Sequence, residues 1–223
     1  MELVIDDLSC WRGGRLVFQG LSARLKPGHA LAVRGANGSG KSSLLRVLAG
    51  LVPAAGGSVR LGDADLKSRT SWQEQVAYAG HLDAVKPALT VADNLAVWAS
   101  LFAAPAALRT EALDWFDLSP IADRPAAQCS AGQKRRLGLA RLVLMRGRPL
   151  WLLDEPTVSL DAAASGRVAD LVRAHLADGG LALIATHVAL GLDDLDELQM
   201  PGPPGAFAEA SDGGDAFLRG DWA

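Results

Sequence analysis

One stretch decides the fold: Gly35-Ala36-Asn37-Gly38-Ser39-Gly40-Lys41-Ser42. An apolar run at residues 29–34 precedes it and predicts a buried strand, and the leucines that follow it, from Leu44 to Leu51, have helical spacing. Glycines let backbone amides turn toward an anion, in conformations that a Cβ would obstruct. The helix that begins near Lys41 directs the positive end of its dipole to the same place. The stretch therefore predicts a phosphate-binding loop between a strand and a helix.

The predicted loop assigns tasks to its residues, with ATP and Mg²⁺ as the expected ligands. Lys41 should neutralise charge on the β- and γ-phosphates, and the Ser42 hydroxyl should bind Mg²⁺. The remaining ATP contacts are expected from Gly35, Ala36, Asn37, Gly38, Ser39, Gly40 and Ser43. A glycine-rich loop that merely connects a strand to a helix is the alternative, and the strand–loop–helix context makes it the weaker one.

Two carboxylates end a second apolar run, Leu150-Trp151-Leu152-Leu153-Asp154-Glu155. Because successive strand residues point to opposite faces, Asp154 and Glu155 should have different tasks. Asp154 suits the Mg²⁺ shell opposite Ser42, and Glu155 suits the polarisation of an attacking water as general base. An Asp-Glu pair can also be the solvated start of a loop, but the phosphate-binding loop favours the catalytic interpretation.

A third stretch, Cys129-Ser130-Ala131-Gly132-Gln133, distinguishes among the classes of ATPase and kinase that share the first two. Ser130 and Gln133 have the spacing of a capping box, which predicts a helix start that offers amides and a hydroxyl to an anion. The stretch resembles the LSGGQ signature of ABC ATPases, with Ala131 in place of the first glycine. The resemblance implies that Ser130, Ala131, Gly132 and Gln133 cap the ATP held by a second copy of the chain, so that catalysis requires a dimer.

Two further features resemble the same family. The stretch Val158-Ser159-Leu160-Asp161 is similar to the loop that communicates between the two ATP sites, and Asp161 would be its key carboxylate. His187 follows a short apolar run and resembles the histidine that contacts the γ-phosphate and orients the general base with its water. The resemblance therefore adds His187 to Lys41 and Glu155 as a catalytic residue.

The expected fold is α/β, with a RecA-like P-loop ATPase core, an N-terminal antiparallel β subdomain and an inserted α-helical subdomain. Short apolar runs broken by glycines up to about residue 27 predict the antiparallel strands. An alanine-rich helical period predicts the helical subdomain at about residues 87–147. The nucleotide-binding domain should occupy residues 1–198. Residues 199–223, which are rich in proline, glycine and acidic side chains, should form a loosely ordered tail.

Composition argues against several functions. The net charge of −3 provides no basic field for a nucleic acid backbone, so no nucleic acid partner is expected. The longest apolar run, residues 96–108, is too short for a membrane span, which needs about 20 residues. The first residues lack the pattern of a secretory signal, so we expect a soluble, intracellular protein. Cys10 and Cys129 are interpreted as small buried residues.

Four short patterns resemble one branch of the family, the ATP-binding subunits of bacterial cytochrome c maturation systems. The patterns are Cys10-x-Arg12-Gly13-Gly14-Arg15, Tyr78-x-Gly80-His81, Ser130-Ala131-Gly132-Gln133 and Leu150-Trp151-x-Leu153-Asp154-Glu155-Pro156. The resemblance implies integral membrane permease subunits of a haem-handling complex as partners, and a peripheral place on the cytoplasmic face of the inner membrane. It also implies that ATP hydrolysis powers haem export or the release of haem to its chaperone. The alternatives are an ABC subunit for a different substrate and, less readily, an ABC ATPase that acts on nucleic acid.

Three residues near the expected site keep open roles. His81 stands where the family has a glutamine that contacts Mg²⁺, and neutral imidazole can donate or accept a hydrogen bond as glutamine does. Many ABC ATPases stack an aromatic side chain on adenine at the position of Arg12, whereas the aromatic residue of this chain, Trp11, precedes it. Trp11 is a candidate for that stack or for simple packing, and Arg12 is a candidate for stacking as a cation.

Overall fold

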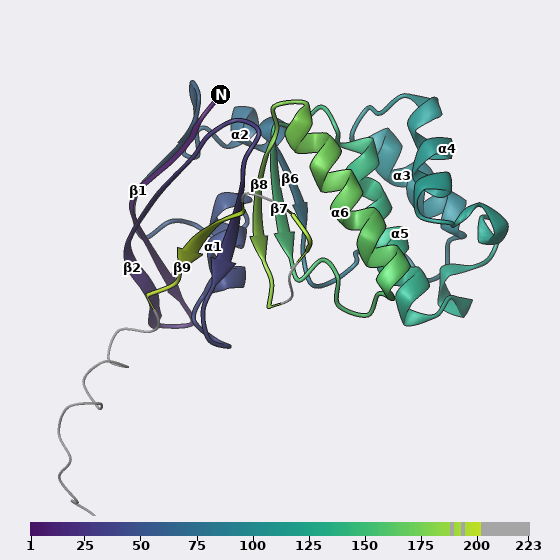
Figure 1. The fold of residues 1–223 in the computed structure, drawn as a ribbon, viewed down its shortest axis with the longest axis horizontal. Coiled ribbons are helices and arrows are strands. Elements are labelled where there is room, and N and C mark those ends of the chain that lie inside the picture. Colours follow the sequence, from purple (N-terminus) through teal and green to yellow (C-terminus); the bar gives the residue numbers. More distant parts are fainter. Residues whose placement is uncertain (188–189, 193–194, 202–223) are drawn as a thin grey trace, which may run out of the picture.

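Two β-sheets and a group of helices lie side by side along the molecule (Figure 1). The computed structural model describes residues 1–187, 190–192 and 195–201. The sheet that contains the N-terminal strand is antiparallel, and the central sheet is parallel. The helices between residues 91 and 144 lie on the far side of the parallel sheet from the antiparallel one. This arrangement confirms the expected α/β fold.

The antiparallel sheet has the strand order β2-β1-β4-β5. Its strands are β1 (Leu3–Arg12), β2 (Arg15–Leu25), β4 (Gly56–Leu61) and β5 (Ala64–Asp65). Gly13 and Gly14 make the tight turn between β1 and β2, and their φ angles of 58° and 76° are of the sign that a two-residue hairpin turn favours. The turn places Arg12 opposite Arg15 at the end of the hairpin.

The parallel sheet has the order β6-β7-β8-β3-β9. Its strands are β3 (Ala30–Arg34), β6 (Val76–Ala79), β7 (Leu150–Asp154), β8 (Leu181–Ala185) and β9 (Leu195–Gln199). Every residue of β7 and β8 is buried, as in strands that are covered on both faces. Because parallel strands end at the same edge of a sheet, the segments that follow β3, β7 and β8 come together there.

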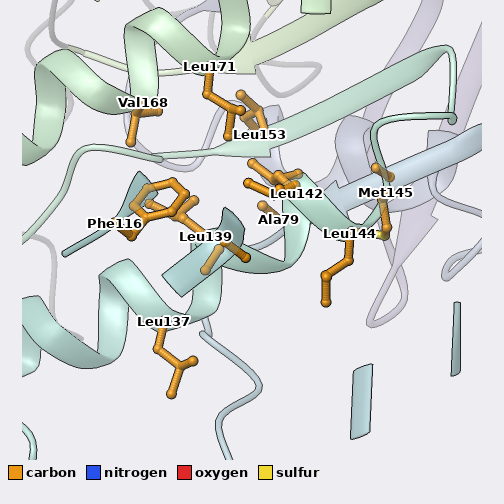
Figure 2. Close-up of a cluster of buried hydrophobic side chains, with 14 of the residues drawn as sticks. Ala79, Phe116, Leu137, Leu139, Leu142, Leu144, Met145, Leu153, Val168 and Leu171 are labelled. Atoms are coloured by element: carbon orange, nitrogen blue, oxygen red, sulfur yellow. The ribbon is translucent and has the colours of Figure 1, made fainter. Parts of the chain in front are cut away.

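Two hydrophobic cores cover the two faces of this sheet. One contains leucines of α1 (Lys41–Leu48) and residues of the antiparallel sheet. The other contains residues of α3 (Val91–Leu101), α4 (Ala106–Trp115), α5 (Ala131–Leu144) and α6 (Ala162–Ala177). Strand alternation along β7 serves both cores, because Leu152 packs in the first and Leu153 in the second. Figure 2 shows part of the second core, where Leu153 lies close to Leu142 and Leu171.

The helix after the phosphate-binding loop, α1, is shorter than expected. This helix ends at Leu48 and Gly50 turns the chain with a φ of 70°, so that Leu51, which the leucine spacing had placed on the helix, is 61% exposed. The region expected to be helical, about residues 87–147, contains α3, α4 and α5. The shorter helical segments are α2 (Arg69–Gln75), η1 (Ser119–Ile121) and η2 (Ala126–Gln128).

The C-terminal limit of the packed chain also differs from expectation. Strand β9 continues to Gln199, and Met200 is buried against the core under the phosphate-binding loop. The packed chain therefore extends beyond residue 198, and the remainder of the expected tail, residues 202–223, lies outside the described residues. None of the helices in the described part of the chain combines the length and the apolar character that a membrane span requires.

Candidate nucleotide-binding and catalytic site

A cavity of about 710 Å³ opens at the carboxyl edge of the parallel sheet. Its lining comes from the hairpin between β1 and β2, the loop after β3, helix α1 and the ends of β7 and β8. The lining residues are Arg12, Arg15, Leu16, Val17, Asn37, Gly38, Gly40, Lys41, Ser42, Ser43, Arg46, Asp154, Glu155 and His187. Four of these residues are cations and two are carboxylates. The lining therefore carries an excess of positive charge, which suits a polyphosphate.

The phosphate-binding loop requires glycine at two positions. Gly35 and Gly40 have φ angles of 147° and 102°, and a Cβ on Gly40 would lie 2.8 Å from Cγ1 of Val17. Gly40 also caps the N-terminus of α1, so the free amides of that helix face the loop. The ammonium group of Lys41 donates hydrogen bonds to the carbonyl oxygens of Gly35 (2.8 Å) and Ala36 (3.0 Å). A phosphate group in the cavity would therefore meet the amides and the ammonium together.

Ser42 and Asp154 are in direct contact beside the loop. The Ser42 hydroxyl donates a hydrogen bond of 2.9 Å to Oδ1 of Asp154, whose side chain is almost completely buried. The second carboxylate oxygen, Oδ2, is buried and has no hydrogen-bond partner within the described structure. Such an oxygen is costly to bury unless a donor or a cation meets it, and Mg²⁺ prefers oxygen ligands of this kind. The pair therefore fits the expected Mg²⁺ site.

Glu155 and His187 meet at the wall of the same cavity. Oε1 of Glu155 lies 3.7 Å from Nε2 of His187. Glu155 has a φ of 49°, which is unusual for a non-glycine residue and turns the chain directly after β7. Its backbone N–H donates a hydrogen bond of 2.8 Å to the carbonyl oxygen of Ala185, the last residue of β8. The ends of two strands thus hold a carboxylate and an imidazole together, which is the arrangement expected of a general base and a residue that orients it.

The signature residues start a helix, but at a different place on the surface. The Ser130 hydroxyl accepts a hydrogen bond from the N–H of Gln133, and Oε1 of Gln133 accepts one from the N–H of Ser130. This geometry confirms the expected capping box at the start of α5. Ala131 lines a separate cavity of about 240 Å³, together with His81 and the loop at residues 158–159. Within the described part of one chain, the signature and the phosphate-binding loop do not line the same cavity.

The residues with open roles divide between the two cavities. Arg12 lines the larger cavity, whereas its neighbour Trp11 is 56% exposed and does not belong to the described lining. His81 lines the smaller cavity with the signature and not the larger one. Asp161 caps α6, where its Oδ1 accepts a hydrogen bond of 2.7 Å from the N–H of Ala164. Asp161 therefore fixes the start of helix α6, in addition to the expected role in communication between two ATP sites.

A buried arginine of the signature helix was not expected to be a site residue. Arg135 donates hydrogen bonds to Oδ1 of Asp83 (2.8 Å) and to the carbonyl oxygens of Gly80 (3.0 Å), Asp154 (3.2 Å) and Glu155 (2.6 Å). One side chain thus ties the start of α5 to the catalytic strand end. The sequence shows only a basic helix there, because the partners of Arg135 lie far away along the chain.

A second arginine of α5, Arg141, is also buried, and the loss of solvation lowers its pKa to about 10. It donates hydrogen bonds to the carbonyl oxygens of Asp83 (3.3 Å) and Tyr78 (3.1 Å). Arg135 and Arg141 therefore fasten one helix to the same segment, residues 78–83, which runs from the end of β6 into the loop that follows it. That segment contains the Tyr78-x-Gly80-His81 pattern, so the signature helix and this pattern form one connected unit.

Comparison with known proteins identifies the family. The family model described as ABC transporter matches residues 18–158. A cytochrome c biogenesis ATP-binding export protein, CcmA, of Ruegeria pomeroyi is 53% identical over 193 residues, which are 86% of this chain and 88% of the relative. The CcmA protein of Cereibacter sphaeroides is 50% identical over 200 residues, 90% of this chain and 89% of the relative. The chain belongs to the ABC transporter family, among its CcmA proteins.

Solved structures agree in fold with this ABC protein. The ATP-binding subunit of an ABC transporter superposes with a TM-score of 0.80 at 23% identity, and the match covers 90% of this chain and 86% of that one. A putative ABC transporter ATP-binding protein of Pyrococcus furiosus gives 0.77 at 21% identity, with 90% and 98% covered. The expected RecA-like P-loop ATPase fold and the expected family are therefore confirmed. As a member of this family, the chain is an ATP hydrolase coupled to transport.

Proposed function

We propose that two copies of this ATPase share each ATP, with the phosphate-binding loop of one copy facing the start of α5 in the other. The observation that carries the proposal is the separation of these two anion-binding elements within one chain. Ser130 uses its hydroxyl oxygen as an acceptor in the capping box, so its hydroxyl hydrogen remains able to bond an anion from outside. A structure that agrees in fold, a post-hydrolysis ATP-binding cassette with ADP and Pi, is dimeric.

Within each shared site, different residues of the chain would bind the phosphates, bind Mg²⁺ and accept the proton of the attacking water. Lys41 and the amides of the phosphate-binding loop would hold the β- and γ-phosphates, and Ser42 with Asp154 would hold Mg²⁺. Mg²⁺, when bound, supplies positive charge to the phosphate oxygens. Glu155 would accept a proton from the attacking water, and His187 would keep Glu155 and that water in line with the γ-phosphate. Asp161 lies two residues after Ser159, which lines the same cavity as Ala131 of the signature, and it would transmit the state of one site to the other.

For the base of the nucleotide, we propose Arg12 as the contact. Arg12 lines the cavity beside Arg15 at the end of the hairpin, and its planar cation can stack on an aromatic base. The placement of Trp11 outside the lining favours Arg12 over Trp11. His81 lines the cavity of the signature, so any nucleotide contact of His81 would arise in the paired state.

A groove of about 350 Å³ on another face suits a membrane partner. It lies between the end of α1 and the helical region, and Tyr78, Trp98, Phe102 and Met145 are among its lining residues. Two large apolar side chains at this groove, Leu51 and Leu101, are 61% and 72% exposed. Exposed apolar side chains gathered at a groove are typical of a surface that another protein covers.

We propose that the groove binds the integral membrane permease subunits of a cytochrome c biogenesis exporter. The chain would then act at the cytoplasmic face of the inner membrane as a peripheral protein. The function for which its relatives are named, ATP-binding export in cytochrome c biogenesis, supports this assignment. Haem, exported or released to its chaperone, is the cargo we propose.

The test is co-purification from solubilised membranes of cells that make cytochrome c. The tagged parent should bring down the permease subunits of the cytochrome c biogenesis system, identified by mass spectrometry. Leu51→Glu and Leu101→Glu should lose these subunits and keep the ATPase activity of the isolated protein. Ala174→Glu, on the exposed face of α6, is the matched control and should retain them. Capture of a permease of another transport system, or retention by both groove variants, would contradict the proposal.

A further inference from the structure

Arg34 joins three strands at the edge where the site lies. It is the last residue of β3 and directly precedes Gly35, and β3 lies between β8 and β9 in the sheet. Nη1 of Arg34 donates a hydrogen bond of 2.7 Å to the carbonyl oxygen of Thr186. Its Nε donates one of 3.2 Å to Oε1 of Glu197 on β9. One guanidinium thus connects the end of β8 to the C-terminal strand.

The Thr186 carbonyl belongs to the peptide group that also contains the backbone nitrogen of His187. Because a peptide group is planar, a hydrogen bond that fixes the orientation of its oxygen also fixes the positions of the backbone nitrogen and Cα of the next residue, His187. The preceding carbonyl, that of Ala185, accepts its bond from the N–H of Glu155. The two carbonyls before His187 are therefore held by two different residues, Glu155 and Arg34.

We propose that Arg34 is a positioning residue for hydrolysis, which holds the Thr186–His187 peptide so that the imidazole stays close to Glu155. Glu197 orients the guanidinium for this bond. The fork of an arginine donates in two directions from one rigid plane, which the single ammonium of a lysine does not reproduce. Arg34 is not among the residues that line the site cavity, and its effect passes through His187. The inference rests on the proposed role of His187 in catalysis.

The first test observes His187 without turnover. The chain has four histidines, so the ring signals of all of them can be followed by NMR, with His187→Ala assigning one. Arg34→Met should shift or broaden the His187 signal and leave the other three in place. Arg167→Met is the matched control, because Arg167 also donates to a backbone carbonyl, that of Trp115, and pairs with an exposed aspartate. An unchanged His187 signal in Arg34→Met, or a shift of all four signals, would overturn the proposal.

The second test separates positioning from binding by steady-state ATP hydrolysis at varied ATP concentration. Arg34→Met should lower kcat about tenfold or more, with KM for ATP within about twofold, because a small misplacement costs rate rather than binding. Arg34→Lys should recover part of the rate. In the His187→Ala background, Arg34→Met should have no further effect, whereas additive losses would contradict action through His187. If His187→Ala hydrolyses ATP at the parent rate, the catalytic role of His187 fails, and the NMR result still decides whether Arg34 holds it.

Discussion

Replacing Arg135 by methionine should destabilise the protein and the catalytic strand end together. The side chain of Arg135 is 6% exposed and bonds four acceptors, of which one is the carboxylate of Asp83 at 24% exposure. Removing one partner of a buried, hydrogen-bonded ion pair typically costs about 3–5 kcal/mol. A domain of this kind has a total stability of about 5–15 kcal/mol, so the loss would be a large fraction of it.

Urea unfolding, followed by tryptophan fluorescence and by circular dichroism, measures this loss. The matched control is the next residue of the same helix, Arg136, which donates to one carbonyl oxygen, that of Phe116, and pairs loosely with an exposed aspartate. Arg136→Met should lose only about 1 kcal/mol. The expected loss in the free energy of unfolding of Arg135→Met is about 3–5 kcal/mol, and a loss smaller than about 1 kcal/mol would refute the reasoning. It is also refuted if Arg135→Met and Arg136→Met lose equal stability.

Three further predictions concern the site and the core. Glu155→Gln should bind ATP as the parent does but hydrolyse it at least about 100-fold more slowly, and a filter-binding assay beside a phosphate-release assay checks both parts. Gly38 and Gly40 both have a positive φ, of 81° and 102°, but only at Gly40 would a new Cβ meet Val17. Gly40→Ala should therefore lose about 2–4 kcal/mol in urea unfolding, and Gly38→Ala, with open space around it, only about 1 kcal/mol for the backbone strain. Burial lowers the pKa of His175, so the unfolded chain binds a proton at this residue more readily than the folded chain does. The stability that His175 contributes above about pH 6.5 should therefore be lost as the pH falls. The free energy of unfolding should decrease by at most about 1.4 kcal/mol per pH unit. His175→Phe should remove that slope between pH 7 and pH 5.5, and an unchanged slope would contradict the assignment.

Features that depend on near neighbours were predictable from the sequence. The capping box at Ser130 and Gln133 is set by a spacing of three residues, and the hydrogen bonds have the expected partners. The phosphate-binding loop is similar, because its glycines, strand and helix are continuous in the chain. The contact between Ser42 and Asp154 joins distant residues. It was expected because Ser42 lies in the loop-and-helix segment that follows one parallel strand, Asp154 ends another, and parallel strands end at the same edge of a sheet.

The two arginines that organise the site could not be predicted in this way. Arg34 bonds the carbonyl of Thr186, and Arg135 bonds those of Gly80 and Glu155, all of them distant in sequence. A backbone carbonyl is present at every residue, so no residue type in the sequence marks these acceptors. Strand β9 was not predicted because it lies at the edge of the sheet and exposes Asp196 and Glu197. An edge strand with exposed acidic residues has a composition similar to that of a loop.

The measurement that tests the shared site most directly uses two inactive variants in one mixture. Lys41→Ala disables the phosphate-binding loop, and Ser130→Asp keeps a good helix cap while it places a negative charge before the phosphates. Each variant alone should be inactive. An equal mixture should recover about a quarter of the parent rate, because half of the pairs are mixed and each mixed pair has one intact site of two. A mixture that hydrolyses no more ATP than its separate components would contradict the account, as would full turnover by Ser130→Asp alone.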